Sequence, residues 1–491
     1  MDQGHLFFNA DPVEVLVDGD SIDLEIRINE GPQATVNKVT ITGNTKTSDY
    51  VIMREIRTKP GDKFSKTDIQ RSIRELAALG YFDPEKLNVV PTPNPYTGTV
   101  DIEYQVEEKS SDQIELSGGF GQGFVVGTLG LNLTNFSTRK LMNRREWNPI
   151  PSGDGQRISL RAQSNGSFFQ SYNASFTEPW FGGKKPNSLS VSMYHSIQSN
   201  GVRRQDVTPA RQRQALNITG LTIGFGKRNK IPDDFFTTNI MLNYQYYNVQ
   251  NYPGIIAFRD GFSNNINLRW ILQRNSMDQP IYPRSGSSFL FSVQATPPWS
   301  RFSDKNYAEA TAQEKYRWIE YHKWKFEGAW YTKLVGNLVL TAQAKMGYMG
   351  NYNKDIGDAP FERFYLGGAG LIGFNIDGRE LIAFRGYEDN SVTPQGGATV
   401  FNRFTVELRY PISLNPQATV YVHSFMEAGN SWSSLRTYNP FGLLRSAGTG
   451  VRIFLPMFGL LGIDWGYGFD ENPFRPGTNR GRFHFFIGQQ F

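Results

Sequence analysis

From residue 112 to its end, this sequence alternates apolar and polar side chains, a pattern that few folds can accommodate. The alternation is clearest in residues 266–272, 289–295, 340–348 and 404–410. Successive side chains of a β-strand point to opposite faces, so each segment would present one apolar and one polar face. No helical period interrupts this pattern, and we therefore expect an all-β region.

The terminal segment makes this expectation more specific. Phe483, Phe485, Ile487 and Phe491 fall on one face of an extended strand that also contains Gly488. A bare hydrophobic strand edge in water would aggregate, so this strand has to pair with another strand. A sheet that closes on itself inside a lipid bilayer leaves no open edge. We expect the terminal strand to meet the first strand of the same sheet, in a transmembrane barrel of about 16 antiparallel strands.

Hydropathy favours a membrane barrel over a helical membrane protein. A membrane-spanning helix needs about 18 or more apolar residues in a row, whereas the longest apolar stretch, residues 454–463, contains Pro456 and Gly459. A barrel strand needs only every second residue to be apolar. A soluble β-sandwich also explains the alternation, but it poorly explains aromatic residues near so many strand ends, which an interfacial girdle requires. Examples are Trp180, Phe181, Trp299, Trp318, Trp324 and Trp330.

Charge divides the chain into two parts. Residues 1–111 carry 12 Lys or Arg against 19 Asp or Glu, so the rest of a chain with net charge +5 is strongly basic. The solvated surfaces of two domains would explain this division. A basic rim on a barrel would also suit an outer-membrane lipid leaflet rich in anionic phosphate, such as lipopolysaccharide. The basic residues are scattered and no nucleic-acid-binding motif accompanies them, so we expect no nucleic-acid partner.

No catalytic or metal site emerges from the sequence. The absence of cysteine excludes disulfides, thiol catalysis and cysteine metal sites. The five histidines lack metal-ligand spacing, and there is no G-x-S-x-G elbow. Residues 118–123 are rich in glycine, but no Lys-Ser/Thr pair follows them, so a flexible strand fits better than a phosphate loop. We expect a protein that is not an enzyme and has no catalytic residue, metal or cofactor.

Residues 34–108 predict an α+β unit. A strand at 36–41 precedes a helix at 49–57, a second helix begins at Ser65, and a hairpin spans 87–106. This order, with TITGN at 40–44 and LAALGYF at 76–82, resembles a POTRA domain. Residues 1–33 resemble the C-terminal part of a preceding POTRA copy. Residues 1–5 have neither the basic start nor the apolar core of a signal peptide, and we expect that the chain is truncated or processed.

Three motifs in the all-β region extend the resemblance. Arg385-Gly386-Tyr387 lies in a long polar segment, residues 462–466 contain an x-D-x-G strand motif, and the terminal strand ends on Phe491. Together with the POTRA-like segment, these motifs resemble those of a superfamily of outer-membrane barrels. That superfamily contains BamA-type assembly factors and two-partner-secretion transporters. The resemblance implies a barrel over residues 112–491 with an inward-folded loop around residues 366–399.

The first two motifs are physically linked. Asp464 alternates with glycines on one strand face and should point into the barrel, where Arg385 is a natural partner. Glu427, on the same strand face as His423, is a second candidate acid. On the residues alone, carboxylates that merely line a wet lumen are the more frequent case; the resemblance favours a loop-to-barrel lock of Arg385, Gly386, Tyr387, Asp464 and Glu427. Residues 369–384 separate the aromatic-Gly-Gly strand end at 364–368 from Arg385, and this departure from the superfamily pattern predicts an inserted hairpin.

The two end strands predict a weak lateral seam. The first strand, expected at residues 114–124, is loaded with glycine, and glycine weakens strand pairing. The seam residues we expect are Gly118, Gly119, Phe120, Gly121 and Gly123 on the first strand and Phe485, Ile487, Gly488 and Phe491 on the last. An incoming strand would add to such an edge by β-augmentation.

The resemblance implies a function in the outer membrane of a Gram-negative bacterium, with the POTRA portion in the periplasm. The expected role is that of the central subunit of the β-barrel assembly machinery, which receives unfolded outer-membrane proteins and templates their insertion at the seam. Its expected partners are these clients, accessory lipoproteins that dock on the POTRA portion, and outer-membrane lipid. The alternative is a two-partner-secretion exporter; a passive porin or receptor is a third reading, which the POTRA domain disfavours.

Overall fold

The computed structural model describes residues 2–19, 21–109, 112–121, 124–147, 149–208, 212–233, 235–252, 258–369, 379–415, 418–455 and 459–488. It divides into two compact units. The N-terminal unit contains Met1–Ile114 and Leu131–Ile158, and the barrel unit contains Glu115–Gly130 and Ser159–Phe491.

The N-terminal unit contains a small mixed sheet with two helices. Its strands follow the order β3-β5-β4, in which β3 is parallel and β4 antiparallel to β5. The bounds are β3 (Thr35–Thr42), α1 (Asp49–Met53), α2 (Lys66–Ala78), β4 (Asn88–Asn94) and β5 (Thr99–Gln105). The side chain of Ser65 accepts a hydrogen bond from the backbone N–H of Asp68 and caps α2. The helices and the sheet share a core of buried apolar residues that includes Val51, Leu76, Phe82, Val100 and Ile102.

The first helix is shorter than the sequence indicated. It ends at Met53 instead of continuing to Arg57. The backbone N–H of Arg57 donates to Oγ of Ser72 on α2, at 2.9 Å, and so is not available to an α1 carbonyl. Tertiary packing therefore ends this helix one turn early.

A separate antiparallel hairpin precedes this sheet. It consists of β1 (Asn9–Asp18) and β2 (Ser21–Asn29). Alternate residues of β2 form an apolar row that is more than half exposed: Ile22, Leu24, Ile26 and Ile28. In the described part of the chain no element covers this row, although exposed apolar area costs roughly 25 cal/mol per Å².

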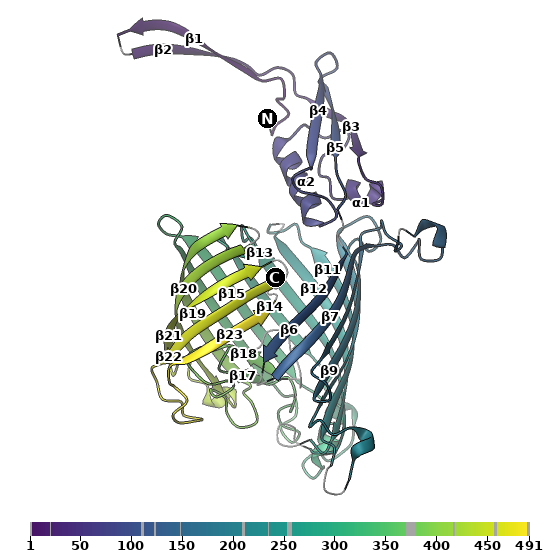
Figure 1. The fold of residues 1–491 in the computed structure, drawn as a ribbon, viewed down its shortest axis with the longest axis vertical. Helices are drawn as coiled ribbons and strands as arrows, with labels where there is room; N and C mark the ends of the chain where they lie inside the picture. Colours follow the sequence, from purple (N-terminus) through teal and green to yellow (C-terminus); the bar gives the residue numbers. More distant parts are fainter. Residues whose placement is uncertain are drawn as a thin grey trace. The chain divides into compact units, whose positions relative to one another are not determined.

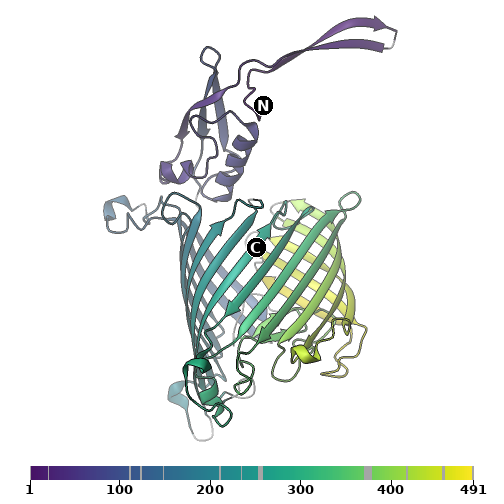
Figure 2. The ribbon, with the colours of Figure 1, turned by 180° about the vertical axis from the view of Figure 1, so that it is seen from behind.

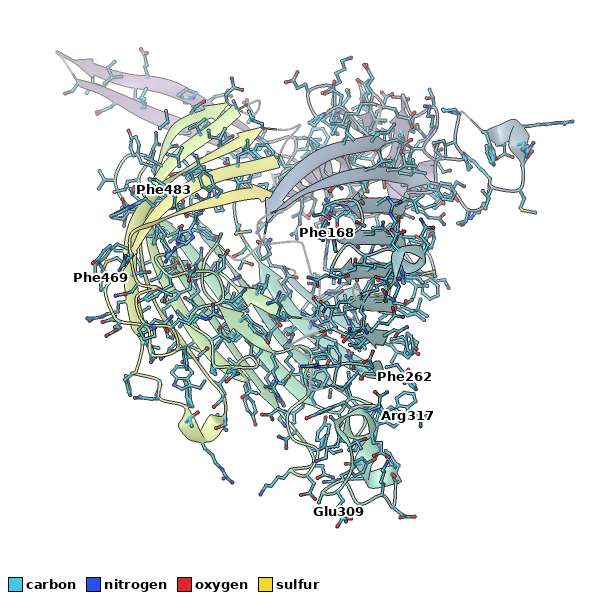
Figure 3. The ribbon with its side chains drawn as sticks, turned by 60° about the horizontal axis from the view of Figure 1, so that its bottom comes forward. Phe168, Phe262, Glu309, Arg317, Phe469 and Phe483 are labelled. Atoms are coloured by element: carbon cyan, nitrogen blue, oxygen red, sulfur yellow. The ribbon has the colours of Figure 1, made fainter. Side chains whose placement is uncertain are left out.

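The barrel sheet has 16 strands within the described residues, ordered β23-β22-β21-β20-β19-β16-β15-β14-β13-β12-β11-β10-β9-β8-β7-β6. Its strands up to the inward loop are β6 (Gln113–Gly121), β7 (Phe124–Phe136), β8 (Gln156–Ser164), β9 (Phe169–Glu178), β10 (Asn187–Ser199), β11 (Ala215–Arg228), β12 (Phe236–Gln250), β13 (Gly261–Asn275), β14 (Gly286–Ala295), β15 (His322–Lys333) and β16 (Val339–Gly350). After the loop come β19 (Val400–Asn415), β20 (Ala418–Trp432), β21 (Leu444–Leu455), β22 (Gly459–Gly468) and β23 (Arg482–Gly488). The sheet curls until its end strands, β6 and β23, lie beside each other (Figures 1 and 3).

Side-chain alternation gives this barrel an apolar outside. On β19, Val406, Leu408 and Tyr410 are about half exposed, whereas Thr405 and Glu407, on the opposite face of the strand, are buried. The long teal and green strands of the rear wall are seen in Figure 2. No helix among the described residues has both the length and the apolar character of a membrane span. The predicted fold class, an α+β unit followed by an antiparallel 16-stranded barrel, is confirmed.

The connections between strands differ at the two rims of the barrel. At the rim where β6 begins, most are short, such as residues 229–235 and 334–338. The other rim carries longer loops, including residues 296–321 and 351–399. The connection at residues 137–155, between β7 and β8, is the longest at the first rim, and it belongs to the N-terminal unit.

The base of the 137–155 connection is locked to the α1 region by polar contacts. The amide of Asn135 donates to Oγ1 of Thr47 at 2.8 Å, and the backbone N–H of Ser48 donates to the carbonyl of Gly153 at 2.9 Å. The hydroxyl of Tyr81 donates to the carbonyl of Gly155 at 3.2 Å. The end of β7, the start of β8 and the connection between them thus form one packed body with the small mixed sheet.

Candidate functional site inside the barrel

The loop between β16 and β19 returns on itself to position its tip. Its strand β17 (Phe364–Leu366) pairs with β18 (Glu380–Ile382), and the backbone N–H of Phe384 donates to the carbonyl of Gly368 at 2.9 Å. The β17–β18 pair is parallel. The inserted hairpin expected in residues 369–384 stays a prediction, because residues 370–378 lie outside the described residues.

Arg385 is buried at the centre of an ion-pair cluster. Its Nε and Nη2 donate to Oε1 of Glu427 at 2.9 and 2.6 Å, and its Nη1 donates to Oδ2 of Asp464 at 2.9 Å. A further bond joins Nη2 to Oε1 of Glu407 at 2.8 Å. The guanidinium also lies over the ring of Phe425, 3.6 Å from its centroid. The structure thus brings together three of the expected lock residues, Arg385, Glu427 and Asp464.

Each carboxylate of the cluster has a second arginine partner from the barrel wall. The pairs are Glu407 with Arg409, Glu427 with Arg403, and Asp464 with Arg452. Four arginines therefore face three carboxylates in the described cluster. Buried charges of this kind are tolerated because each is paired and hydrogen-bonded.

Gly386 allows the loop tip to lie directly on the wall. Its φ is +87°, and a Cβ there would come within 2.9 Å of the Gly468 backbone N, the Tyr467 carbonyl carbon and the Ser446 Cβ. The wall glycines Gly466 and Gly468 receive it: Cβ atoms on them would meet Gly386 backbone atoms at 2.8 and 2.9 Å. Side chains at any of these positions would push the tip away from the strands.

Tyr387 anchors the other side of the tip. It is fully buried, and its ring stacks on Phe384 with centroids 4.9 Å apart and an interplanar angle of 7°. Its hydroxyl lies within hydrogen-bond distance of two carbonyls, those of Arg445 at 3.0 Å and Asp470 at 3.1 Å. Apolar packing and a hydrogen bond therefore hold Tyr387 in place.

The tip also reaches the last barrel strand. The backbone N–H of Gly386 donates to Nε2 of His484 on β23, at 3.0 Å. The tip contacts five consecutive strands at one end of the sheet order: β19 through Glu407, β20 through Glu427, β21 through the Arg445 carbonyl, β22 through Asp464 and β23 through His484.

A second set of charged contacts holds Glu362 and Glu380 of the loop to β15. Nζ of Lys323 lies 2.6 Å from Glu380 and 3.2 Å from Glu362, and Nζ of Lys325 lies 2.6 Å from Glu380. Apolar residues of the loop, such as Phe361, pack in a buried cluster with residues of β11 and β12; the Phe361 ring stacks on Tyr247 at 4.0 Å. The loop thus places Glu362 and Glu380 against β15, and it places Arg385 against β19, β20 and β22.

Several of these residues were missed from the sequence: Arg403, Glu407, Arg409, Arg452, His484, Lys323, Lys325 and Glu380. A signal for some of them was present. On β19, Arg403, Glu407 and Arg409 alternate with the apolar residues of the lipid-facing side. Charged residues on the opposite face of a lipid-facing strand point into the barrel.

The predicted seam residues fall on the two end strands, as far as the described residues reach. Gly118, Gly119, Phe120 and Gly121 lie in β6, and Phe485, Ile487 and Gly488 lie in β23. Phe485 is 57% exposed, as is expected for the outer face, and Phe483 on the same face is labelled in Figure 3. Gly123 and Phe491 lie outside the described residues. The expectation that the first strand reaches Phe124 is wrong, because Phe124 already begins the next strand, β7.

A small mixed sheet with two helices, followed by a barrel with a loop tip bound inside it, defines the class of POTRA-containing outer-membrane barrels. The chain belongs to the Omp85 superfamily: residues 152–491 match the Omp85 superfamily domain, and residues 34–109 match the POTRA model, described as a surface antigen variable number repeat. Membership of this superfamily places the barrel in the bacterial outer membrane and the POTRA portion in the periplasm.

Curated relatives agree with this assignment. The chain is 24% identical over 466 residues to the outer membrane protein assembly factor BamA of Neisseria meningitidis, covering 88% of this chain and 50% of the relative. It is 26% identical over 485 residues to BamA of Nitratidesulfovibrio vulgaris, covering 96% of this chain and 53% of the relative. The chain therefore spans about half the length of these relatives.

Solved structures share the fold. The structure of BamA from Haemophilus ducreyi lacking POTRA domains 1-3 matches with a TM-score of 0.61 at 18% identity, covering 99% of this chain and 90% of that one. CdiB from Escherichia coli matches with a TM-score of 0.58 at 12% identity, covering 99% and 81%. The fold alone therefore does not separate the two kinds of protein.

Proposed function

We propose that this chain is the central subunit of an outer-membrane β-barrel assembly machinery. Its POTRA portion receives unfolded outer-membrane proteins, and the seam between β6 and β23 templates their folding into the bilayer. Similarity to curated assembly factors supports the general role. The seam mechanism rests on the geometry of the barrel.

The observation that carries this proposal is the contact of the loop tip with five consecutive strands that end at β23. These contacts hold strands β19 to β23 together and keep β23 in a fixed position. A fixed strand edge is a good template, because an incoming strand gains its backbone hydrogen bonds without ordering the edge first.

The opposite side of the seam has the properties of a strand that releases easily. Gly118, Gly119 and Gly121 supply three of the nine residues of β6. Glycine gives a strand no side chain to pack and a high conformational entropy on release. We infer that the seam opens by separation of β6 from a stationary β23. Arg385, Gly386, Tyr387, Asp464 and Glu427 act in this scheme as the lock that keeps β23 stationary.

The hairpin β1–β2 supports a domain assignment for the N-terminus. We propose that residues 1–33 are the C-terminal part of a preceding POTRA domain, that residues 34–108 form a complete one, and that residues 112–491 form the barrel with its inward loop at 366–399. The exposed apolar row of β2 would then be the face that helices of the preceding POTRA domain cover. Free strand edges of the POTRA sheets are the proposed contact surface for clients and accessory lipoproteins.

A reconstituted assembly assay tests the seam. Cysteines are introduced in pairs, one among residues 116–120 and one among residues 483–487, into a chain that has no cysteine of its own. The pair that cross-links is then compared, oxidised and reduced, for its ability to fold an unfolded barrel protein in liposomes. We expect activity to fall on oxidation and to return on reduction. Full activity of the oxidised form would refute the lateral seam.

Depletion in cells tests the general role. Loss of many unrelated outer-membrane barrels is the expected result. Loss of a single secreted protein, with other barrels unchanged, would identify the chain as an exporter of the two-partner-secretion type instead.

A further inference from the structure

The tip of the 137–155 connection is an exposed group of apolar and basic residues. Met142 is 92% exposed, Leu141 45% and Trp147 40%. Residues 139–147 also carry four Lys or Arg and a single acid, Glu146. Apolar and basic side chains that share one small exposed segment are typical of proteins that rest on an anionic membrane surface.

This segment is an ordered turn. The side chain of Asn143 begins the short helix η1 (Arg144–Glu146) by accepting from the Arg145 N–H, and it donates to Glu146 at 2.6 Å. The Trp147 indole donates to the carbonyl of Lys140 at 3.2 Å, which fixes its ring. Nζ of Lys140 donates to the carbonyl of Ser152 at 2.8 Å and ties the turn to its base. The exposed apolar side chains are therefore held in place, and the one acid of the turn is engaged with Asn143.

The position of the segment in the chain fixes which lipid surface it can meet. It joins β7 to β8 at the rim where β6 begins, and β6 directly follows the POTRA portion. This is the periplasmic rim. The outer faces of the same two strands carry exposed apolar residues, Leu129 at 56% and Leu160 at 46%, as is expected of strands that face lipid.

Other connections at this rim repeat the same combination. Phe181 is 49% exposed beside exposed Lys184 and Lys185, and Ile231 is 85% exposed beside exposed Lys230. Exposed Lys333 precedes Leu334 and Val335, which are 46% and 79% exposed. Each turn pairs an apolar side chain with a cation, as anchors at a membrane–water interface do.

We propose that residues 140–147 bind the headgroups of anionic phospholipid in the periplasmic leaflet. Met142, Leu141 and the Trp147 ring enter the headgroup–acyl boundary, and Arg144 and Arg145 bind lipid phosphate. Because the base of the same connection is bonded to the POTRA α1 region, this contact ties the POTRA domain to the membrane surface. The inference depends on the outer-membrane location and is independent of the seam mechanism.

A single spin label tests the contact in the full chain. Met142→Cys is labelled with a nitroxide, which needs no background substitution because the chain lacks cysteine. The protein is placed in vesicles of phosphatidylcholine with phosphatidylglycerol, and relaxation by a water-soluble nickel complex is compared with relaxation by oxygen. Tyr96→Cys, in a POTRA turn where Tyr96 is 100% exposed, is the matched aqueous control.

We expect the label at 142 to be shielded from the nickel complex in anionic vesicles and the label at 96 to be open to it. Each arginine near an anionic surface adds roughly 1 kcal/mol, so R144E together with R145E should lower the shielded population on the order of tenfold or more. Equal nickel access at 142 and 96 in anionic vesicles would overturn the proposal. So would shielding that persists in detergent micelles and survives the charge reversal, because the label would then contact protein.

Discussion

The backbone N–H of Gly386, at the tip of the inward loop, donates to Nε2 of His484 on the last barrel strand, 3.0 Å away. Because Nε2 accepts, the imidazole is neutral with its proton on Nδ1. This bond links the lock directly to one side of the proposed seam. The loop therefore acts on the edge strand itself as well as on the wall behind it.

Replacement of His484 should loosen the edge strand. In H484A the buried Gly386 N–H loses its acceptor, an unsatisfied donor that costs roughly 1–3 kcal/mol. We expect faster amide hydrogen exchange across residues 482–488 and slower client assembly. H484Q, whose side-chain oxygen can accept, should restore part of both. H195A is the control, since His195 is a partly exposed residue of β10 whose imidazole is hydrogen-bonded to Thr219. Unchanged exchange in H484A would show that the bond does not hold β23.

From the charge cluster we expect that loss of its central arginine destabilises the barrel less than loss of one of its carboxylates. R385A leaves three arginines and three carboxylates, and each acid keeps its wall partner. E427Q leaves four arginines facing two carboxylates, and breaking a buried pair this way costs about 3–5 kcal/mol. We expect E427Q to lower the urea midpoint of barrel unfolding clearly more than R385A does. R385A should instead reduce assembly activity in a barrel that stays folded. K305A, in an exposed pair with Glu314, serves as the control.

Gly386 and Gly357 form a matched pair in the same loop. Both have positive φ, +87° and +79°, so alanine is strained at each. A Cβ at 386 would meet the wall at 2.9 Å, whereas at 357 its nearest neighbour is 3.9 Å away. We expect G386A to release the tip and to expose the segment around Arg385 to added protease, while G357A does not. Equal protease resistance of the two variants would contradict the close approach.

A second glycine pair tests the packing of the POTRA domain against the connection between β7 and β8. A Cβ on Gly153 would come within 2.3 Å of the Lys46 carbonyl oxygen, whereas a Cβ on Gly166, also at positive φ, meets nothing within 4 Å. G153A should break the contacts of Ser48 and Thr47 with the connection. We expect amide exchange to rise in residues 45–52 for G153A alone. A rise of the same size in G166A would trace the effect to backbone strain.

Glu108 predicts a pH dependence in the POTRA unit. Burial raises the pKa of its carboxyl, but hydrogen bonds from the side chains of Thr45 and Thr47 and from the backbone N–H groups of Thr47 and Lys46 outweigh burial and leave the pKa below its usual value. A pKa depressed in the folded state stabilises the fold above the unfolded-state pKa, and that stabilisation is lost as pH falls through the folded-state value.

The corresponding measurement follows amide exchange at residues 45–47, corrected for intrinsic rates. Protection should be constant near neutral pH and should fall in the acidic range. E108Q should show low protection at every pH, whereas E107Q, which changes an exposed neighbour paired with Lys86, should behave as the unmodified chain. Protection in E108Q that still falls with pH would assign the effect to another group.

The fold and part of the site were accessible from the sequence for physical reasons. Alternation with a period of two identified the strands, and an acid among glycines on a lipid-facing strand pointed to an inward site at Asp464. The wall arginines were less accessible. Arg403 reaches Glu427 because β19 and β20 pair Thr405 with Glu427, and strand register of this kind depends on the whole sheet. The early end of α1 likewise depends on Ser72, which accepts from the backbone N–H of Arg57 fifteen positions earlier in the chain.

The five-strand contact of the loop tip has a consequence for how the barrel deforms. The Arg385 guanidinium, the Gly386 backbone N–H and the Tyr387 hydroxyl join strands β19 to β23, so we expect these strands to move as one rigid body. Strain from an arriving client would then concentrate in the opposite arc, where the hinge of any rotation must lie. The barrel would widen by swinging one stiff sector about a flexible remainder, and not by peeling its strands one at a time.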